Sequence, residues 1–127
     1  MNNNLAYNAY SQNSIAIESS TKLISMLYEG VLKFSSLAIR AIDLEDVEKK
    51  VYYINKTIAI FTELVNILDY DNGGDTAKYL AGLYEHQIKL LSLANLEDNT
   101  KNMVTVIGVA KTLLQTWDEE HTSELVD

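Results

Sequence analysis

Residues 47–68 carry two apolar stripes at helical spacing, where a helix on a protein surface needs only one. Both stripes advance by alternating steps of three and four residues, which is the repeat of a heptad seam. They are offset by one residue, so they lie roughly 100° apart around a helix axis. The first stripe consists of Val47, Val51, Ile54, Ile58, Phe61, Val65 and Leu68, and the second of Tyr53, Thr57, Ile60, Leu64 and Ile67.

A helix with so wide an apolar arc is central in its domain or packs on two bodies at once. In the first interpretation both stripes face one core, and the helix lies between two neighbours. In the second interpretation the first stripe faces the core and the second stripe binds a helix of another protein. The second stripe is therefore our candidate partner-binding surface on this helix.

Composition favours one helical domain. The chain has 127 residues, of which 47% are hydrophobic, enough for a single core. It has no proline and five glycines, so long helices can run without interruption. It has no cysteine, which excludes a disulfide framework and a thiolate zinc site. Because we find neither a membrane-spanning apolar run nor a secretory leader, we expect a cytoplasmic protein.

The charge pattern excludes two classes of partner. The formal net charge is −8, and the lysines and arginines are dispersed along the chain. Nucleic acids and anionic membrane surfaces bind clustered cations, so we expect neither as a partner. Acidic residues gather after Trp117 and predict a solvated acidic tail over residues 119–127.

Periodic segments predict the first two helices. Residues 1–18 show no sustained period, so we expect an irregular N-terminal arm there. Ser19 can then act as the N-cap of a first helix that ends near Ile42. A second helix is expected from about Asp46 to about Tyr70.

Two further helices complete the predicted fold. Residues 71–74, Asp-Asn-Gly-Gly, tolerate positive φ and predict a connection to a third helix capped by Gly74 or Asp75. The period breaks at residues 95–99, and Asn99 or Thr100 can cap a fourth helix. Short connections make neighbouring helices antiparallel. We therefore predict an all-α fold, an antiparallel up-down four-helix bundle over residues 19–118.

No motif supports catalysis or a bound metal. The segment from Asp69 resembles the start of a calcium loop, but its fifth position is Gly73 and its twelfth is Leu80 instead of glutamate. The two histidines, His86 and His121, do not form the paired Glu-x-x-His motifs of a di-iron bundle. Phosphate-loop, dinucleotide and nucleophile-elbow motifs are missing. We expect a protein that is not an enzyme and that has no catalytic residue, cofactor or metal.

Tyrosine is abundant, with eight residues, and its large ring with one polar group suits interfaces. Tyr28 and Tyr84 lie on apolar stripes, where they are either core residues with a bonded hydroxyl or interface residues. In the arm, Tyr7, Tyr10 and Ile15 are spaced anchors. The arm is either a disordered tail or a strap over an apolar groove, and these three residues are candidate partner-binding residues.

Several motifs, in order along the chain, resemble the FliS family of flagellar export chaperones. Tyr10-Ser11-Gln12, followed by Ile15, is similar to the family's N-terminal tyrosine–glutamine motif, and residues 19–30 are similar to its helix-one signature. Ser20 stands where the family commonly has proline. The resemblance extends from about residue 7 to residue 118 and includes Ile54-Asn55-Lys56, Glu63-Leu64, Leu68-Asp69, Gly73-Gly74-Asp75-Thr76-Ala77, Leu83-Tyr84, Ala94-Asn95 and Trp117.

The resemblance implies a cytoplasmic chaperone with an antiparallel helical-bundle fold that binds the C-terminal region of flagellin. Bound flagellin would stay competent for flagellar secretion and would not polymerise early. Other flagellar assembly or co-chaperone proteins are further candidate partners. The alternative is a self-assembling helical bundle that binds a different helical client or forms a weak homodimer.

Overall fold

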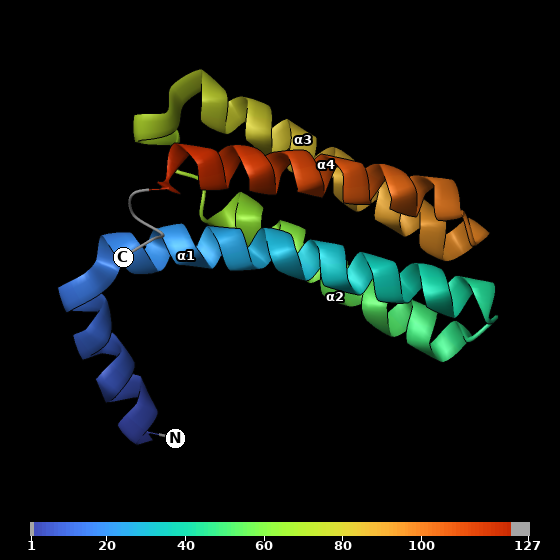
Figure 1. Cartoon of the computed structure of the whole chain (residues 1–127), viewed down its shortest axis with the longest axis horizontal. Helices are drawn as coiled ribbons and strands as arrows, with labels where there is room; N and C mark the ends of the chain where they lie inside the picture. Colours follow the sequence, from blue (N-terminus) through green and yellow to red (C-terminus); the bar gives the residue numbers. More distant parts are fainter. Residues whose placement is uncertain (1, 123–127) are drawn as a thin grey trace.

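The computed structural model describes the backbone of residues 2–122 and the side chains of residues 20–122. Within these residues the chain has no strand and forms four helices, α1 (Asn2–Asp43), α2 (Val47–Asn66), α3 (Tyr70–Glu97) and α4 (Thr100–Glu120). Each helix contacts the next, and α4 also contacts α1, so the helices close a ring (Figure 1). The predicted all-α four-helix bundle is confirmed.

The N-terminal arm differs from expectation, because residues 2–18 are helical. The helix α1 begins at Asn2 and not after an N-cap at Ser19. No proline or glycine precedes Gly30, so no residue in this segment forces the helix to stop. Figure 1 shows the first part of α1 bending away from the bundle. At the other end, α4 reaches Glu120, so the first residues of the predicted acidic tail are helical and residues 123–127 lie outside the described part.

The connection between α2 and α3 also lies elsewhere than expected. It comes before the Gly-Gly pair, and Asp69 is the N-cap of α3 in place of Gly74 or Asp75. The Asp69 carboxylate accepts hydrogen bonds from the backbone N–H of Asn72 at 3.1 Å and from its side-chain amide at 2.7 Å. Gly74 instead kinks α3, with φ of 51° and ψ of −126°, a conformation that favours glycine.

Two other predicted helix starts are confirmed. Asp46 caps α2 by accepting a hydrogen bond from the backbone N–H of Lys49. Asn99 caps α4 by accepting from the backbone N–H groups of Lys101 and Asn102. Both starts lie at the same end of the bundle, because α2 and α4 run in the same direction.

A buried lysine holds this end together, and we call it the clamped end. The Lys50 side chain lies near the start of α2 and is 7% exposed. Its ammonium group donates a hydrogen bond to the backbone oxygen of Asn95 at 2.9 Å and lies 2.7 Å from the carboxylate of Asp98. Asp98, with φ of 52°, is the C-cap of α3. The start of α2 is thus tied to the end of α3.

Both apolar stripes of α2 contribute to the core of the protein. Ile54 and Phe61 of the first stripe are fully buried, and so are Thr57 and Leu64 of the second. This burial supports the interpretation in which α2 lies between two neighbours, and α2 does contact both α1 and α3. A wide apolar arc is therefore accounted for by internal packing over most of the helix.

Candidate functional site

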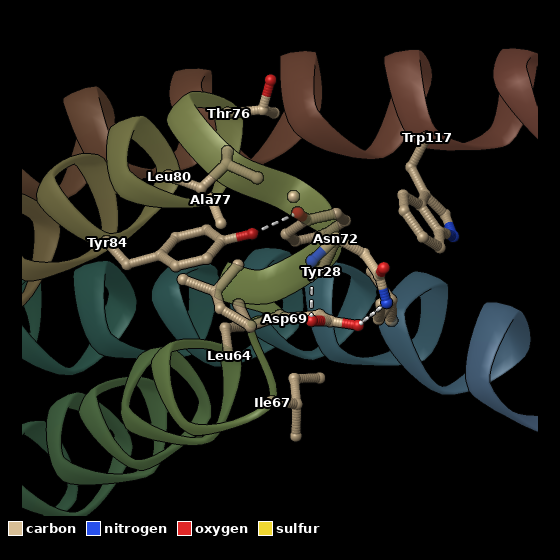
Figure 2. A pocket seen from close by; sticks show the side chains of 13 residues that line it. Tyr28, Leu64, Ile67, Asp69, Asn72, Thr76, Ala77, Leu80, Tyr84 and Trp117 are labelled. Atoms are coloured by element: carbon tan, nitrogen blue, oxygen red, sulfur yellow. Dashed lines mark hydrogen bonds between the residues drawn. The ribbon is translucent and has the colours of Figure 1, made fainter.

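An apolar cavity of about 370 Å³ opens at the opposite end of the bundle, which we call the hollow end (Figure 2). All four helices contribute to it, together with the connection between α2 and α3. Cavities of this size with apolar walls and a few polar groups are typical of binding sites. Its apolar walls include Ile24 of α1, Leu64 and Ile67 at the end of α2, Leu80 of α3, and Trp117 of α4.

Two buried tyrosines from different helices meet at this cavity. The hydroxyl oxygens of Tyr28 in α1 and Tyr84 in α3 lie 2.6 Å apart and share a hydrogen bond (Figure 2). The side chains are 3% and 2% exposed. Burial, and then the hydrogen bond with Tyr84, raise the pKa of Tyr28 well above its usual range, and burial also raises the pKa of Tyr84. Both phenols are therefore neutral at physiological pH.

One charged group, the Asp69 carboxylate, also lines the cavity. The hydrogen bonds from the side chain and then the backbone of Asn72 lower the pKa of the Asp69 carboxyl group. Asp69 is consequently ionised at neutral pH, and it is solvent-exposed. The cavity thus combines apolar walls, a neutral hydroxyl pair and one negative charge.

Trp117 joins α4 to the bundled part of α1. Its indole N–H donates a hydrogen bond to the backbone oxygen of Thr21 at 3.0 Å, and its ring stacks on His121 with centroids 3.9 Å apart. Next to it, the hydroxyl of Ser25 donates to the carboxylate of Asp118 at 3.0 Å. These contacts hold the wall that Trp117 contributes to the cavity.

The structure divides the second stripe of α2 between two locations. Leu64 and Ile67 line the cavity, and Ile67 is 37% exposed. Tyr53 packs on Phe34 of α1 with ring centroids 6.1 Å apart. Ile60 is half-buried against α1, where its Cδ1 atom lies 2.9 Å from the position that a Cβ on Gly30 would take.

Thr57, the other residue of the predicted stripe, does not line the cavity. Thr57 is fully buried and donates a hydrogen bond to the backbone oxygen of Tyr53. The side chains of Tyr7, Tyr10 and Ile15 lie outside the described residues. The structure therefore brings together only the end of the predicted stripe.

Sequence reasoning did not name several cavity residues as partner-binding residues. Ile24, Leu80 and Trp117 stand on ordinary apolar helix faces, and their spacing carries no sign of a cavity. For Tyr28 and Tyr84 the sequence leaves two alternatives, a core residue with a bonded hydroxyl or an interface residue. The structure shows core residues with a bonded hydroxyl that also line the cavity.

Two other classes of site are missing from the described residues. No group of three or more His, Asp or Glu side chains among residues 20–122 could hold a metal ion. Within the same part of the chain no helix is long and apolar enough to cross a membrane.

A shallow groove of about 570 Å³ between α3 and α4 contains Tyr79, Leu83 and Gly108 but offers no charged group.

A helical bundle with a mostly apolar, solvent-open cavity is suited to hold part of another protein. The family model described as "Flagellar protein FliS" matches residues 1–124. The chain is 57% identical over 126 residues to the flagellar secretion chaperone FliS of Campylobacter jejuni, which covers 99% of this chain and 98% of that protein. It is 31% identical over 121 residues to the flagellar secretion chaperone FliS of Bacillus subtilis, with coverage of 95% and 90%.

A third relative is the flagellar secretion chaperone FliSB of Pseudomonas aeruginosa, 32% identical over 97 residues, which cover 76% of this chain and 77% of that protein. The chain therefore belongs to the FliS family of flagellar secretion chaperones, which is not a family of enzymes. The resemblance found in the sequence motifs is confirmed.

Proposed function

We propose that this protein is a cytoplasmic export chaperone that binds the C-terminal region of flagellin. Binding would prevent premature polymerisation and keep flagellin competent for flagellar secretion. The observation that carries the proposal is the similarity, over nearly the whole chain, to the flagellar secretion chaperone of Campylobacter jejuni. The helical bundle and its apolar cavity supply a physical means of binding.

The cavity suits a client segment that folds as it binds. An amphipathic segment can form a helix whose apolar side chains contact Ile24, Leu80 and Trp117, which removes apolar surface from water on both sides. The segment loses conformational entropy when it becomes ordered, and this loss limits the affinity. A limited affinity suits a client that must later be released for secretion.

Within the predicted partner-binding stripe, we assign direct flagellin contact to Ile67, and we assign Leu64, which is 1% exposed, to the inner wall of the cavity. Both line the cavity, and Ile67 at its edge is accessible to a client. We assign Tyr53, Thr57 and Ile60 to the internal packing of the bundle, because Tyr53 and Ile60 contact α1 and Thr57 is fully buried.

The experiment that tests the function measures complex formation with purified flagellin. Size-exclusion chromatography with light scattering should show a stoichiometric complex with full-length monomeric flagellin. It should show no complex with flagellin that lacks its C-terminal region. An unrelated amphipathic helical peptide of equal length serves as the control for non-specific apolar binding. Equal binding of intact and truncated flagellin would overturn the proposal, and so would a homodimer that binds neither.

We also propose that the N-terminal arm contributes to client affinity through Tyr7, Tyr10 and Ile15. These are its spaced apolar and aromatic residues, and they belong to the part of the chain that precedes the bundle. Isothermal titration of full-length protein and of a variant without residues 1–16 against a flagellin C-terminal fragment tests this role. The affinities should differ while both forms keep the same helical bundle, and identical affinities would show that the arm plays no part.

A further inference from the structure

The hydrogen bond between Tyr28 and Tyr84 leaves one hydroxyl proton over. Each phenol carries one proton and can also accept, and the bond at 2.6 Å uses one of the two protons whichever oxygen donates. Neither hydroxyl makes a second hydrogen bond within the described residues. The pair therefore retains one donor that has no acceptor among the described residues.

This remaining donor lies in a mostly apolar cavity, where leaving it without a hydrogen-bond acceptor is unfavourable. Both tyrosines line the cavity, and both are almost fully buried among apolar residues such as Leu64 and Leu80. In the free protein, water that enters the open cavity can accept the proton. A client that displaces this water without supplying an acceptor leaves a buried donor unsatisfied, which costs affinity. A purely apolar client is thus a poor match.

Asp69 restricts the kind of acceptor that fits. Its carboxylate lines the same cavity and is ionised, so it repels a client carboxylate. The Asp69 carboxylate also repels the negative C-terminal end of a client helix, whose free carbonyl oxygens could otherwise accept the proton. Its oxygens accept two hydrogen bonds from Asn72 and have capacity for more. The best client group is neutral and offers both an acceptor and a donor.

A carboxamide meets both requirements, because its oxygen accepts and its nitrogen donates. We propose that the cavity is a subsite for an Asn or Gln side chain within an apolar segment of the flagellin C-terminal region. Its oxygen accepts the remaining proton of the Tyr28–Tyr84 pair, and its amide nitrogen donates to Asp69. This inference rests on the proposed function and names the chemistry that the site selects.

The test removes the donors without changing the shape of the site. In the double variant Tyr28→Phe/Tyr84→Phe no hydroxyl remains, and the affinity for a flagellin C-terminal fragment should fall about tenfold. Either single variant keeps one hydroxyl, which is released from the pair and can donate to the client. The affinity of each single variant should therefore stay within about threefold of the unmodified protein.

Thermal stability without client should follow a different order, which separates binding from folding. A single substitution leaves the surviving hydroxyl without its partner, whereas the double substitution removes both groups. Both single variants should therefore melt below the double variant. Tyr79→Phe is the matched control, because it removes the same atom from an exposed tyrosine of α3 that does not line this cavity. It should leave affinity and melting temperature unchanged.

A second arm of the experiment identifies the client group. Each Asn and Gln of the flagellin fragment is replaced in turn by Leu, and affinity is measured for the unmodified protein and for the double variant. One replacement should weaken binding to the unmodified protein and have little further effect on the double variant, the mark of a direct coupling.

Equal affinity of the double variant and the unmodified protein would overturn the inference while leaving the proposed function intact. A loss in the double variant that couples to no Asn or Gln would point to a backbone carbonyl and would also overturn the carboxamide assignment. Failure of the unmodified protein to bind the fragment would instead refute the proposed function.

Discussion

At the clamped end of the bundle a buried lysine joins two helices, whereas at the hollow end the helices surround a cavity. The Lys50 ammonium is paired with a carboxylate and also donates to a backbone oxygen. The Tyr28–Tyr84 pair is neutral and keeps one unused proton. The clamped end thus uses its polar groups for stability, whereas the hollow end has an unused hydroxyl proton and apolar walls, which we propose bind the client. Substitutions at the two ends should accordingly separate folding from binding.

The largest expected effect distinguishes the middle of α2 from its hollow end. Ile60→Glu places a carboxylate against α1 at Gly30 and should lower the free energy of unfolding by roughly 2–4 kcal/mol. Ile67→Glu, at an exposed edge of the cavity, should change stability little but weaken flagellin binding, because it adds a charge near Asp69. Urea unfolding and calorimetric titration measure the two effects. An Ile60→Glu variant that is stable but does not bind would reverse our assignment.

The second prediction concerns the clamped end. Lys50→Met keeps a long apolar side chain but removes the ammonium group, so the backbone oxygen of Asn95 loses its partner. The free energy of unfolding should fall by about 1–3 kcal/mol. Lys49→Met is the matched control, because that lysine is exposed and lies 4.0 Å from Asp46, and its loss should cost under about 0.5 kcal/mol. Equal losses would show that Lys50 does not clamp the helices. Flagellin affinity should be unchanged in both variants.

The third prediction compares two glycines of α3. Gly74 has positive φ at the kink beside the cavity, so Gly74→Ala should destabilise the fold by about 1–2 kcal/mol. Gly82 lies in the helix, and nothing lies within 4 Å of the position a Cβ would take. Gly82→Ala should therefore stabilise the fold by about 0.5–1 kcal/mol. Thermal unfolding measures both, and changes of the same sign would contradict the conformation of Gly74.

The smallest effect is the pH dependence of the hollow end. Burial raises the pKa of Tyr28 and Tyr84 above the value of about 10 in an unfolded chain. Above pH 10 the unfolded chain therefore releases protons that the folded protein retains, and stability falls as pH rises. Urea unfolding should show stability falling as the pH rises above 10, and the fall should be smaller in Tyr28→Phe/Tyr84→Phe. An identical pH dependence of both proteins would contradict the burial of these hydroxyls.

The sequence predicts most of the fold because helix formation depends on residues that are close together along the chain. The apolar stripes fix the faces of the helices, and Asp46 and Asn99 are of residue types that favour the N-cap position. Ser19 shows the limit of such reasoning. A capping residue marks a start only if the preceding residues leave the helix, and here they continue it. A glycine such as Gly74 is compatible with a connection between helices and with a kink inside a helix. Because Asp69 caps α3 five residues earlier, Gly74 lies inside α3 and forms a kink.

The candidate site is less predictable because it depends on tertiary structure. Ile24, Leu80 and Trp117 come from three helices, and only the packing of those helices makes them neighbours. The second stripe of α2 is continuous in sequence, but the burial of Thr57 and the accessibility of Ile67 depend on what surrounds each residue. Periodicity identifies an apolar face and does not say where that face becomes accessible.

The hydrogen bond from Trp117 to Thr21 has a kinetic consequence. It joins two residues that are 96 positions apart and thereby connects α4 to α1. The other helix pairs in contact, α1 with α2, α2 with α3 and α3 with α4, are neighbours along the chain. Closing so long a loop costs more entropy than forming a helical hairpin, so we expect α4 to dock on α1 as the last step of folding. Without proline, the chain has no slow prolyl isomerisation to obscure this step. Trp117 is the only tryptophan, so its fluorescence in a stopped-flow experiment would follow the closing of the ring directly.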